Sequence, residues 1–364
     1  MLSGQLGVGG VPKVIFNISK NLIANGENVE VAFLGGNDAG ESRFREAGIP
    51  VTQLGRSPQD PRGIKNLISH LASSKPDVLH THMAIASAVG RVVGKATQIP
   101  VVSTIHTDYK NRTFPAKFID YTTSGLSDMN ISVSSAVQKS LPQSFDFGSH
   151  SQIIHNCIDS SYVYQKGNTQ WSENNWTDGI PEYQPLVVTV GRFDPKKRHE
   201  DLIRALDIIH QKREDVVVAM TGWGDRREQL EKVAQEANVQ DSVFFVGKVE
   251  NPYSLFHHSD IISFQSLHEG FSIAMLEAMA FGTPIVATDI PPFREALGKS
   301  YPLVPTRSPN ELANKILQFL SDKKMARQLG DHVQERVNER FSGSKAARSY
   351  SEVYSKVSDE NRKG

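Results

Sequence analysis

The sequence predicts an α/β protein of two domains, each a doubly wound parallel sheet with helices on both faces. Short apolar runs of strand length alternate with longer segments of helical spacing along most of the chain. The 364 residues exceed one ordinary domain. A polar stretch at residues 160–184, rich in glycine and asparagine, has the composition of a linker or surface excursion. We therefore expect one domain at residues 1–180 and a second at residues 181–343.

The composition is that of an ordinary globular protein. Lys plus Arg and Asp plus Glu number 40 each, so no net charge favours binding to nucleic acid. The single cysteine, Cys157, excludes an intrachain disulfide and indicates a reducing compartment. No apolar run approaches the ~20 residues that span a bilayer, and the N-terminus lacks a signal-peptide pattern. We expect a soluble, cytoplasmic protein, with peripheral contact to the inner face of the membrane left open.

The first element is a glycine loop that leads into a helix. Pro12 suits the first helical turn, and apolar residues recur at one-turn spacing until Gly26. Pro12 also replaces the third glycine of the dinucleotide-binding pattern, which argues against a dehydrogenase. Such a loop normally follows a strand, yet few residues precede Gly7. We therefore expect the first strand of this domain to be missing, through truncation or a late start.

Strands and helices then alternate through the first domain. We expect strands at residues 29–34, 49–54, 77–82, 100–105, 129–133 and 152–154. We expect helices at residues 61–73, 84–96, 114–124 and 134–141. In a doubly wound sheet, ligands bind beyond the carboxyl ends of the strands, so polar side chains at those ends are candidate site residues.

Three histidines lie at strand ends in the first domain. His80 and His82 share one face of a strand, but a metal site would need a further ligand from elsewhere, so a structural role is favoured. His106 directly follows the strand at 100–105. Spacing alone favours a satisfied structural histidine for His106 as well.

The second domain begins with a buried strand at 185–190 that runs into Gly191 and Arg192. Arg192 offers a planar fork of donors, and Lys197, five residues later, offers a point charge. The alternative for this pair is a solvated basic surface. Further strands are expected at 216–221 and 243–246, which close on Gly222 and on Gly247-Lys248-Val249.

The segment 260–289 has the order strand, loop, helix, strand. The first N–H groups of its helix have no partner within the helix, and the helix dipole adds positive potential, so this end suits a phosphate. Glu269 and Glu277 flank that end. Carboxylates repel phosphate and suit neutral hydroxyls, as on a sugar and a ribose. For either residue taken alone, a helix cap or a solvated side chain is the simpler explanation.

The string Glu269-Gly270-Phe271, then Leu276-Glu277-Ala278-Met279-Ala280, then Gly282-Thr283-Pro284, closely resembles the donor-site motif of retaining GT-B glycosyltransferases of the "glycosyl transferases group 1" superfamily. The resemblance covers nearly the whole chain and is densest over residues 186–289. It implies GT-B architecture, with two Rossmann-like domains facing across a cleft that holds a nucleoside-diphosphate sugar. It also implies that the last helix, in residues 344–364, returns to complete the first domain.

The resemblance also implies roles for individual residues. Arg192 and Lys197 would bind the diphosphate, Glu277 the ribose and Glu269 the sugar hydroxyls. His106 would reach the sugar, oriented by Asp108. The remaining residues expected to bind the donor are Gly10, Gly191, Gly222, Gly247, Lys248, Val249, Gly270, Phe271, Ser272, Ile273 and Leu276.

The expected reaction is transfer of a sugar, such as a hexose, from a UDP-sugar or GDP-sugar to a hydroxyl with retention of configuration. The acceptor would be a glycan, a lipid-linked molecule or a small molecule, as in cell-surface polysaccharide biosynthesis. No Asp-x-Asp motif occurs, so we expect no metal and no other cofactor. The alternatives are a nucleotide-sugar epimerase of the same fold and a non-catalytic nucleotide-sugar binding protein.

Overall fold

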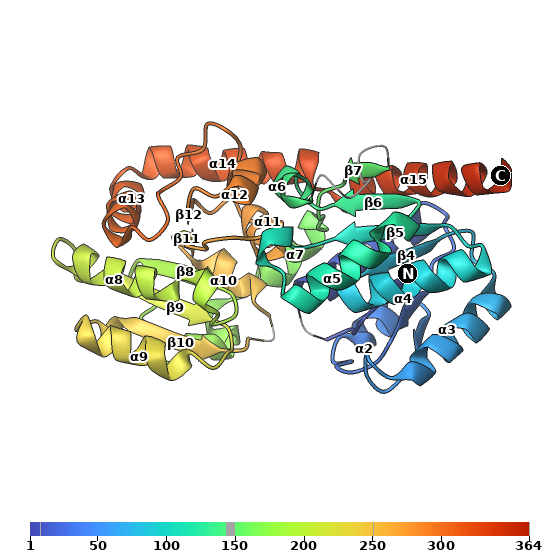
Figure 1. Ribbon diagram of the computed structural model, residues 1–364. Helices are drawn as coiled ribbons and strands as arrows, with labels where there is room; N and C mark the ends of the chain where they lie inside the picture. The colour runs from blue at the N-terminus through green and yellow to red at the C-terminus, as the bar shows by residue number, and fades with distance from the viewer. Residues whose placement is uncertain (8, 143–149, 250, 364) are drawn as a thin grey trace. The chain divides into compact units, whose positions relative to one another are not determined.

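Two parallel sheets, one in each half of the chain, organise the structure (Figure 1). This computed structural model describes residues 1–7, 9–142, 150–249 and 251–363. The first unit comprises Met1–Cys157 and Phe341–Gly364, and the second unit comprises Ile158–Arg340. The closing segment of the chain therefore belongs to the first unit, as the resemblance implied. Among the described residues, no helix has both the length and the apolar character needed to cross a bilayer.

The first unit holds a seven-stranded parallel sheet of order β3-β2-β1-β4-β5-β6-β7. Its strands are β1 (Leu2–Ser3), β2 (Val31–Phe33), β3 (Val51–Gln53), β4 (Leu79–His82), β5 (Val101–Ile105), β6 (Met129–Ser132) and β7 (Ser151–Ile153). The expectation of a missing first strand needs correction, because β1 occupies the central position. Two residues suffice, since Leu2 pairs with Ala32 of β2 on one side and with Thr81 of β4 on the other.

Two layers of helices cover this sheet. The helices of the first unit are α1 (Gly10–Ala24), α2 (Glu41–Glu46), α3 (Pro61–Ser74), α4 (Ala84–Thr97), α5 (Phe114–Thr123), α6 (Ser135–Ser140) and α15 (Gly343–Lys363). Helices α3, α4 and α5 lie side by side on one face (Figure 1). Alternation along β4 separates the layers: Thr81 bonds Ser87 of α4, whereas His80 bonds Tyr354 of α15.

The second unit holds a five-stranded parallel sheet of order β10-β9-β8-β11-β12. Its strands are β8 (Leu186–Val190), β9 (Val217–Thr221), β10 (Val243–Gly247), β11 (Ile261–Phe264) and β12 (Ile285–Ala287). Its helices are α7 (Ser160–Gly167), α8 (His199–His210), α9 (Arg227–Glu236), α10 (Tyr253–His258), α11 (Ile273–Met279), α12 (Pro291–Leu297), α13 (Pro309–Ser321) and α14 (Lys323–Arg340). Apolar side chains of α8, α13 and the sheet form its core.

The structure moves the boundary between the units from residue 180 to residue 157. The stretch 160–184, expected to be a linker or surface excursion, contains α7 and packs on the second unit. Trp176 is buried and its indole Nε1 donates to Ser254 Oγ at 2.8 Å. Two tryptophans in a polar stretch were the overlooked signal, because such large apolar groups seek a core. Pro291 and Pro292 begin α12, since proline suits a first helical turn.

Candidate functional site

The expected donor-binding residues of the second unit gather at one edge of its sheet. All five strands are parallel, so their carboxyl ends lie together. Gly191 and Arg192 follow β8, Gly222 follows β9 and Glu269 lies in the loop after β11. The topology thus brings together residues that are far apart in the sequence.

The ends of β8, β9 and β10 are closed against one another by main-chain contacts. Gly191 N–H donates to the Thr221 carbonyl at 3.0 Å, and Gly222 N–H donates to the Gly247 carbonyl at 2.9 Å. A Cβ on Gly222 would lie 1.9 Å from the Gly191 oxygen, so only glycine fits there. Glycine at these two positions means that neither strand end carries a side chain of its own, and the Lys197 side chain lies against Gly191.

Lys197 and Glu269 form the central contact of the site. The Lys197 Nζ donates to Glu269 Oε1 at 2.6 Å, and Ser266 Oγ donates to the same oxygen at 2.9 Å. Burial is the largest influence and raises the pKa of Glu269, but Lys197, Lys196 and Ser266 together lower the pKa below its ordinary value. Glu269 is therefore ionised at neutral pH, and the two charges are held in a defined geometry.

Main-chain bonds hold the loops that carry this ion pair. The Leu267 N–H donates to the Lys196 carbonyl at 2.8 Å, which joins the loop after β11 to the loop after β8. The Thr288 hydroxyl donates to the Ser266 carbonyl at 2.6 Å. Lys196 thus helps to hold the site through its carbonyl. The Lys197–Glu269 geometry is fixed by the backbone as well as by charge.

The main chain of Arg192 is fixed by a hydrogen bond, whereas its side chain is exposed. The ring of His199 bonds the Arg192 carbonyl at 3.1 Å. Burial lowers the pKa of His199 to about 4, so this ring is neutral at pH 7. The Arg192 guanidinium is 59% exposed and lies 3.7 Å from Asp194, a weak surface contact. Its donors therefore remain accessible to an anion beside Lys197.

Glu277 lies in α11, whose amino end Ser272 caps by accepting from Met275 N–H at 3.3 Å. The Glu277 side chain is buried, and its Oε1 accepts from the Tyr253 hydroxyl at 3.1 Å. Glu277 is thus an oriented carboxylate instead of the solvated side chain considered from the sequence.

Three other expected donor-binding residues near α11 have buried apolar side chains, namely Phe271, Ile273 and Leu276. Only their main chain is left for a ligand, as at Gly270. The Leu276 N–H already donates to the Ser272 carbonyl at 3.2 Å. The contribution of this segment is therefore limited to the first amides of the turn that leads into α11.

Gly247, Lys248 and Val249 lie at the far end of the same sheet edge. Gly247 ends β10 with φ of 69°, a conformation that favours glycine, and a Cβ there would meet open space. The sheet order places β10 three strands from β11. That spacing is roughly 14 Å, enough for an extended ligand to contact both ends of the edge.

His106 of the first unit contacts another histidine. Its Nε2 lies 3.0 Å from His82 Nδ1, and His80 bonds Thr104 and Tyr354. Burial lowers the pKa of His106 to about 3, and it lowers the pKa of His80 and His82 as well. All three rings are therefore neutral at pH 7, and His106 can offer a ligand a hydrogen bond but no positive charge.

The structure also places Asp108 and Gly10, the other residues of the first unit that were expected near the donor. Asp108 does not orient His106 in the structure; its carboxylate accepts from Lys110 N–H at 2.8 Å and caps a 3-10 turn. Gly10 begins α1, where a Cβ would meet nothing within 4 Å. Within the described residues, no group of three or more His, Cys, Asp or Glu is arranged to hold a metal ion.

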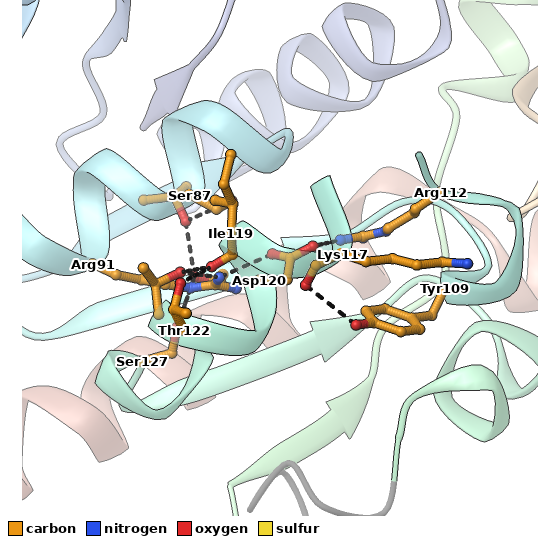
Figure 2. Close-up of polar contacts among 12 residues, drawn as sticks. Ser87, Arg91, Tyr109, Arg112, Lys117, Ile119, Asp120, Thr122 and Ser127 are labelled. Atoms are coloured by element: carbon orange, nitrogen blue, oxygen red, sulfur yellow. Dashed lines mark hydrogen bonds and ion pairs between the residues drawn. The ribbon is translucent and has the colours of Figure 1, made fainter. Parts of the chain in front are cut away.

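Three hydrogen-bonding partners of these residues were not predicted from the sequence. Ser266 stands only three residues before Glu269, so its hydroxyl can reach the carboxylate within one loop, but no sequence pattern singles it out. Tyr253 lies 24 residues from Glu277 and nothing in the sequence links them. In the first unit, Asp120 bonds both Arg91 and Arg112 in a buried network (Figure 2). Only an arginine in an apolar helix hinted at that network.

Family models match the two halves of the chain separately. The model described as "Glycosyltransferase Family 4" matches residues 8–162, and the one described as "Glycosyl transferases group 1" matches residues 172–336. The chain is 25% identical over 296 residues to N-acetyl-alpha-D-glucosaminyl L-malate synthase of Bacillus anthracis, covering 79% of this chain and 77% of that protein. It is 28% identical over 325 residues to phosphatidyl-myo-inositol mannosyltransferase of Mycolicibacterium smegmatis, covering 85% and 78%.

The fold is shared with solved structures. The structure of Anabaena Alr3699/HepE in complex with UDP-glucose matches with a TM-score of 0.84 and 19% identity, covering 98% of both chains. The two parallel-sheet units of this chain are therefore Rossmann-like domains of the GT-B class, as the sequence predicted.

Proposed function

This chain belongs to the glycosyl transferases group 1 family and is a glycosyltransferase, and we propose that it moves a sugar from a UDP-sugar to an acceptor hydroxyl in glycan biosynthesis. The proposal includes retention of the anomeric configuration and independence of metal ions. It includes a cytoplasmic location, in line with the single, buried Cys157.

One observation carries the proposal: the Lys197–Glu269 pair lies beside bare strand ends, with an accessible Arg192 next to it. Breaking the bond between the anomeric carbon and the diphosphate oxygen leaves an electron pair on that oxygen, and the new charge must be stabilised. Arg192 suits this task as a bidentate donor to phosphate oxygens, and Lys197 as a point charge. The amides before α11 add partial positive charge.

The two carboxylates suit the neutral parts of the donor. Glu269, held by Lys197, would accept from sugar hydroxyls, and Glu277, held by Tyr253, from the ribose. In both cases the partner fixes the carboxylate before the ligand arrives, which reduces the ordering cost of binding. His106, neutral and hydrogen-bonded to His82, would add one hydrogen bond to the sugar.

The acceptor is proposed as a class only, because the named relatives differ in it. One relative is named for L-malate and another for phosphatidyl-myo-inositol. A glycan, a lipid-linked molecule or a small molecule each offers the required hydroxyl. Retention would place that hydroxyl on the same face of the sugar as the departing diphosphate.

A donor panel tests the proposal. UDP-, GDP- and ADP-sugars would each be added to the full chain in a thermal-shift assay, followed by incubation with the labelled donor. A UDP-sugar at 100 times its Kd should stabilise by about 2.7 kcal/mol, and slow release of UDP with free sugar should follow. An isomerised donor would indicate an epimerase instead, and binding without turnover would indicate a binding protein. Absence of any stabilisation by the three donor classes would refute nucleotide-sugar binding.

A further inference from the structure

Exposed apolar side chains concentrate on one helical layer of the first unit. Among the described residues, eleven large hydrophobic side chains are exposed, and six of them lie on α3, α4 and α5. These six are Ile64, Ile68, Val92, Phe114, Phe118 and Tyr121. The three helices lie side by side (Figure 1), so the six residues belong to one broad surface. We call this surface the α3–α5 face.

Helix α5 presents its aromatic side to solvent. Phe114, Phe118 and Tyr121 follow one another at helical spacing and are 80%, 59% and 60% exposed. The opposite side carries Asp120, which is buried and bonds Arg91 and Arg112 (Figure 2). The ion pairs therefore fix the rotation of α5 about its axis. An ordinary amphipathic helix would bury its aromatic stripe, so this reversed orientation indicates a use for it.

The charge on the same three helices is one-sided. They carry five basic residues and one acid, although the whole chain has 40 of each sign. The basic residues are Arg62, Lys65, Arg91, Lys95 and Lys117, and the acid is Asp120. Arg91 and Asp120 are buried with each other. Arg62 is already paired with the carboxylate of Asp60, which caps α3. The positive charge that this face offers therefore rests on Lys65, Lys95 and Lys117.

We propose that the α3–α5 face binds an anionic membrane surface. Aromatic rings of α5 would enter the interfacial region, and the lysines around them would contact lipid headgroups. Exposed aromatic and aliphatic groups lie on the same helices as three lysines, and the acid that caps α3, Asp60, is already paired with Arg62. This combination complements an anionic lipid surface. This inference concerns where the enzyme works and goes beyond its proposed reaction; it stands on the first unit alone.

Vesicle flotation of the full chain tests the inference, without any nucleotide sugar. Vesicles of phosphatidylcholine alone and of phosphatidylcholine with 30% phosphatidylglycerol, a mole fraction on the order of that in anionic membranes, would be compared at low and high salt. We expect binding to the anionic vesicles only. We also expect release by 0.5 M NaCl, because the Debye length there is only roughly 4 Å. Equal binding to both vesicles, or none to the anionic ones, would overturn the inference.

Two variants identify the surface. Phe114→Ser with Phe118→Ser and Tyr121→Ser should lower the vesicle partition coefficient at least ~10-fold, since three exposed rings are lost. Lys65→Glu with Lys95→Glu and Lys117→Glu should lower it by about five-fold per lysine.

Matched controls lie on the second unit. Lys212→Glu with Lys232→Glu and Lys324→Glu changes the net charge equally at exposed positions, and Tyr183→Ser removes an exposed ring. Both controls should float like the wild type; a loss as large as in the α3–α5 variants would overturn the assignment to this face. Light scattering on the same variants examines self-association. A dimer that the α5 variant abolishes, without vesicle binding by the wild type, would assign the face to a second copy. Thermal stabilisation by UDP is measured separately. It tests nucleotide binding, and so the proposed reaction, independently of membrane binding.

Discussion

Each unit contains an ion pair between residues far apart in the sequence, and the two pairs differ in how accessible they are to solvent. In the first unit, Arg91 is 1% exposed and Asp120 5%, and the guanidinium also donates to Ser103, Ser127 and Thr123. In the second unit, the side chains of Lys197 and Glu269 are 15% and 11% exposed. They lie next to glycine strand ends and the accessible Arg192.

The difference teaches how to separate a structural ion pair from one in a site. Arg91 uses its donors on protein groups around α4 and α5, so its task is to hold helices together. Lys197 has one carboxylate partner and a bare strand end beside it, so it keeps capacity for a ligand. Both pairs join residues far apart in the chain, and the pairing alone therefore does not reveal a function. A function is indicated instead by accessibility to solvent and by hydrogen-bond donors that remain available to a ligand.

The largest expected effect breaks the structural pair. Asp120→Ala should lower the free energy of unfolding by about 3–5 kcal/mol, because it leaves two arginines without their carboxylate. Urea unfolding followed by circular dichroism measures the loss. Asp215→Ala, which breaks the exposed pair with Arg213, should cost at most about 1 kcal/mol. Similar losses in both variants would contradict the structural role given to Asp120.

The next effect concerns catalysis in the second unit. Arg192→Ala should lower kcat/KM for the donor by about 10²–10³-fold, because one donor to the developing diphosphate charge is lost. The melting temperature should stay the same, since the side chain is exposed. Arg213→Ala is the matched control and should keep full activity. Unchanged turnover in Arg192→Ala would remove this residue from the site.

Acid should affect the first unit more than the second. The first unit holds three histidines whose pKa values are lowered: His80 and His82, which are buried, and His106, which is partly buried. Between pH 6.5 and 4.5 these histidines take up protons in the unfolded chain but stay neutral in the folded protein. The free energy of unfolding is therefore greatest above the histidine pKa of the unfolded chain and falls as the pH drops below it. The loss is up to about 1.4 kcal/mol per pH unit for each ring. The second unit has one such fully buried ring, His199, and two partly buried ones, His257 and His258.

Tryptophan fluorescence distinguishes the units, because all three tryptophans of the chain lie in the second one. On acidification, loss of far-ultraviolet circular dichroism should begin before the tryptophan emission shifts. Simultaneous changes, or an earlier fluorescence change, would show that the buried histidines do not set the acid sensitivity of the first unit.

The smallest effect tests the orientation of Glu277. Tyr253→Phe removes the hydroxyl that Glu277 Oε1 accepts from, at a cost of about 1 kcal/mol. Affinity for UDP should fall about five-fold in calorimetric titration. Tyr183→Phe, at an exposed position, should bind UDP like the wild type. Wild-type affinity in Tyr253→Phe would mean that Glu277 needs no orientation by its neighbour.

Much of the fold could be predicted because its signals are local. Strand-length apolar runs and helical spacing placed nearly every element of both sheets, and parallel topology then put Arg192, Lys197 and Glu269 at one edge. The Lys197–Glu269 bond itself lay beyond prediction, since 72 residues separate the partners. The central strand β1 was missed because two residues carry no periodicity.

The same limit explains the failures in the first unit. The bond between Asp120 and Arg91 depends on how two helices pack, and no spacing within either helix shows it. Asp108 is close to His106 in sequence, yet the side chain that contacts the His106 ring is His82 of the neighbouring strand. Sequence neighbours were thus a poor guide to partners, whereas positions at strand ends were a good one.

The return of α15 to the first unit affects how a ribosome makes this protein. Tyr354 of α15 bonds His80, and Tyr350 lies against the same ring, yet both are synthesised only after the whole second unit. At ~5–20 residues per second, the nascent first unit waits roughly ten seconds or longer with that surface uncovered. A translation product that ends just after Arg340 would therefore carry a complete second unit and a first unit without α15, with the kind of exposed apolar surface that chaperones bind.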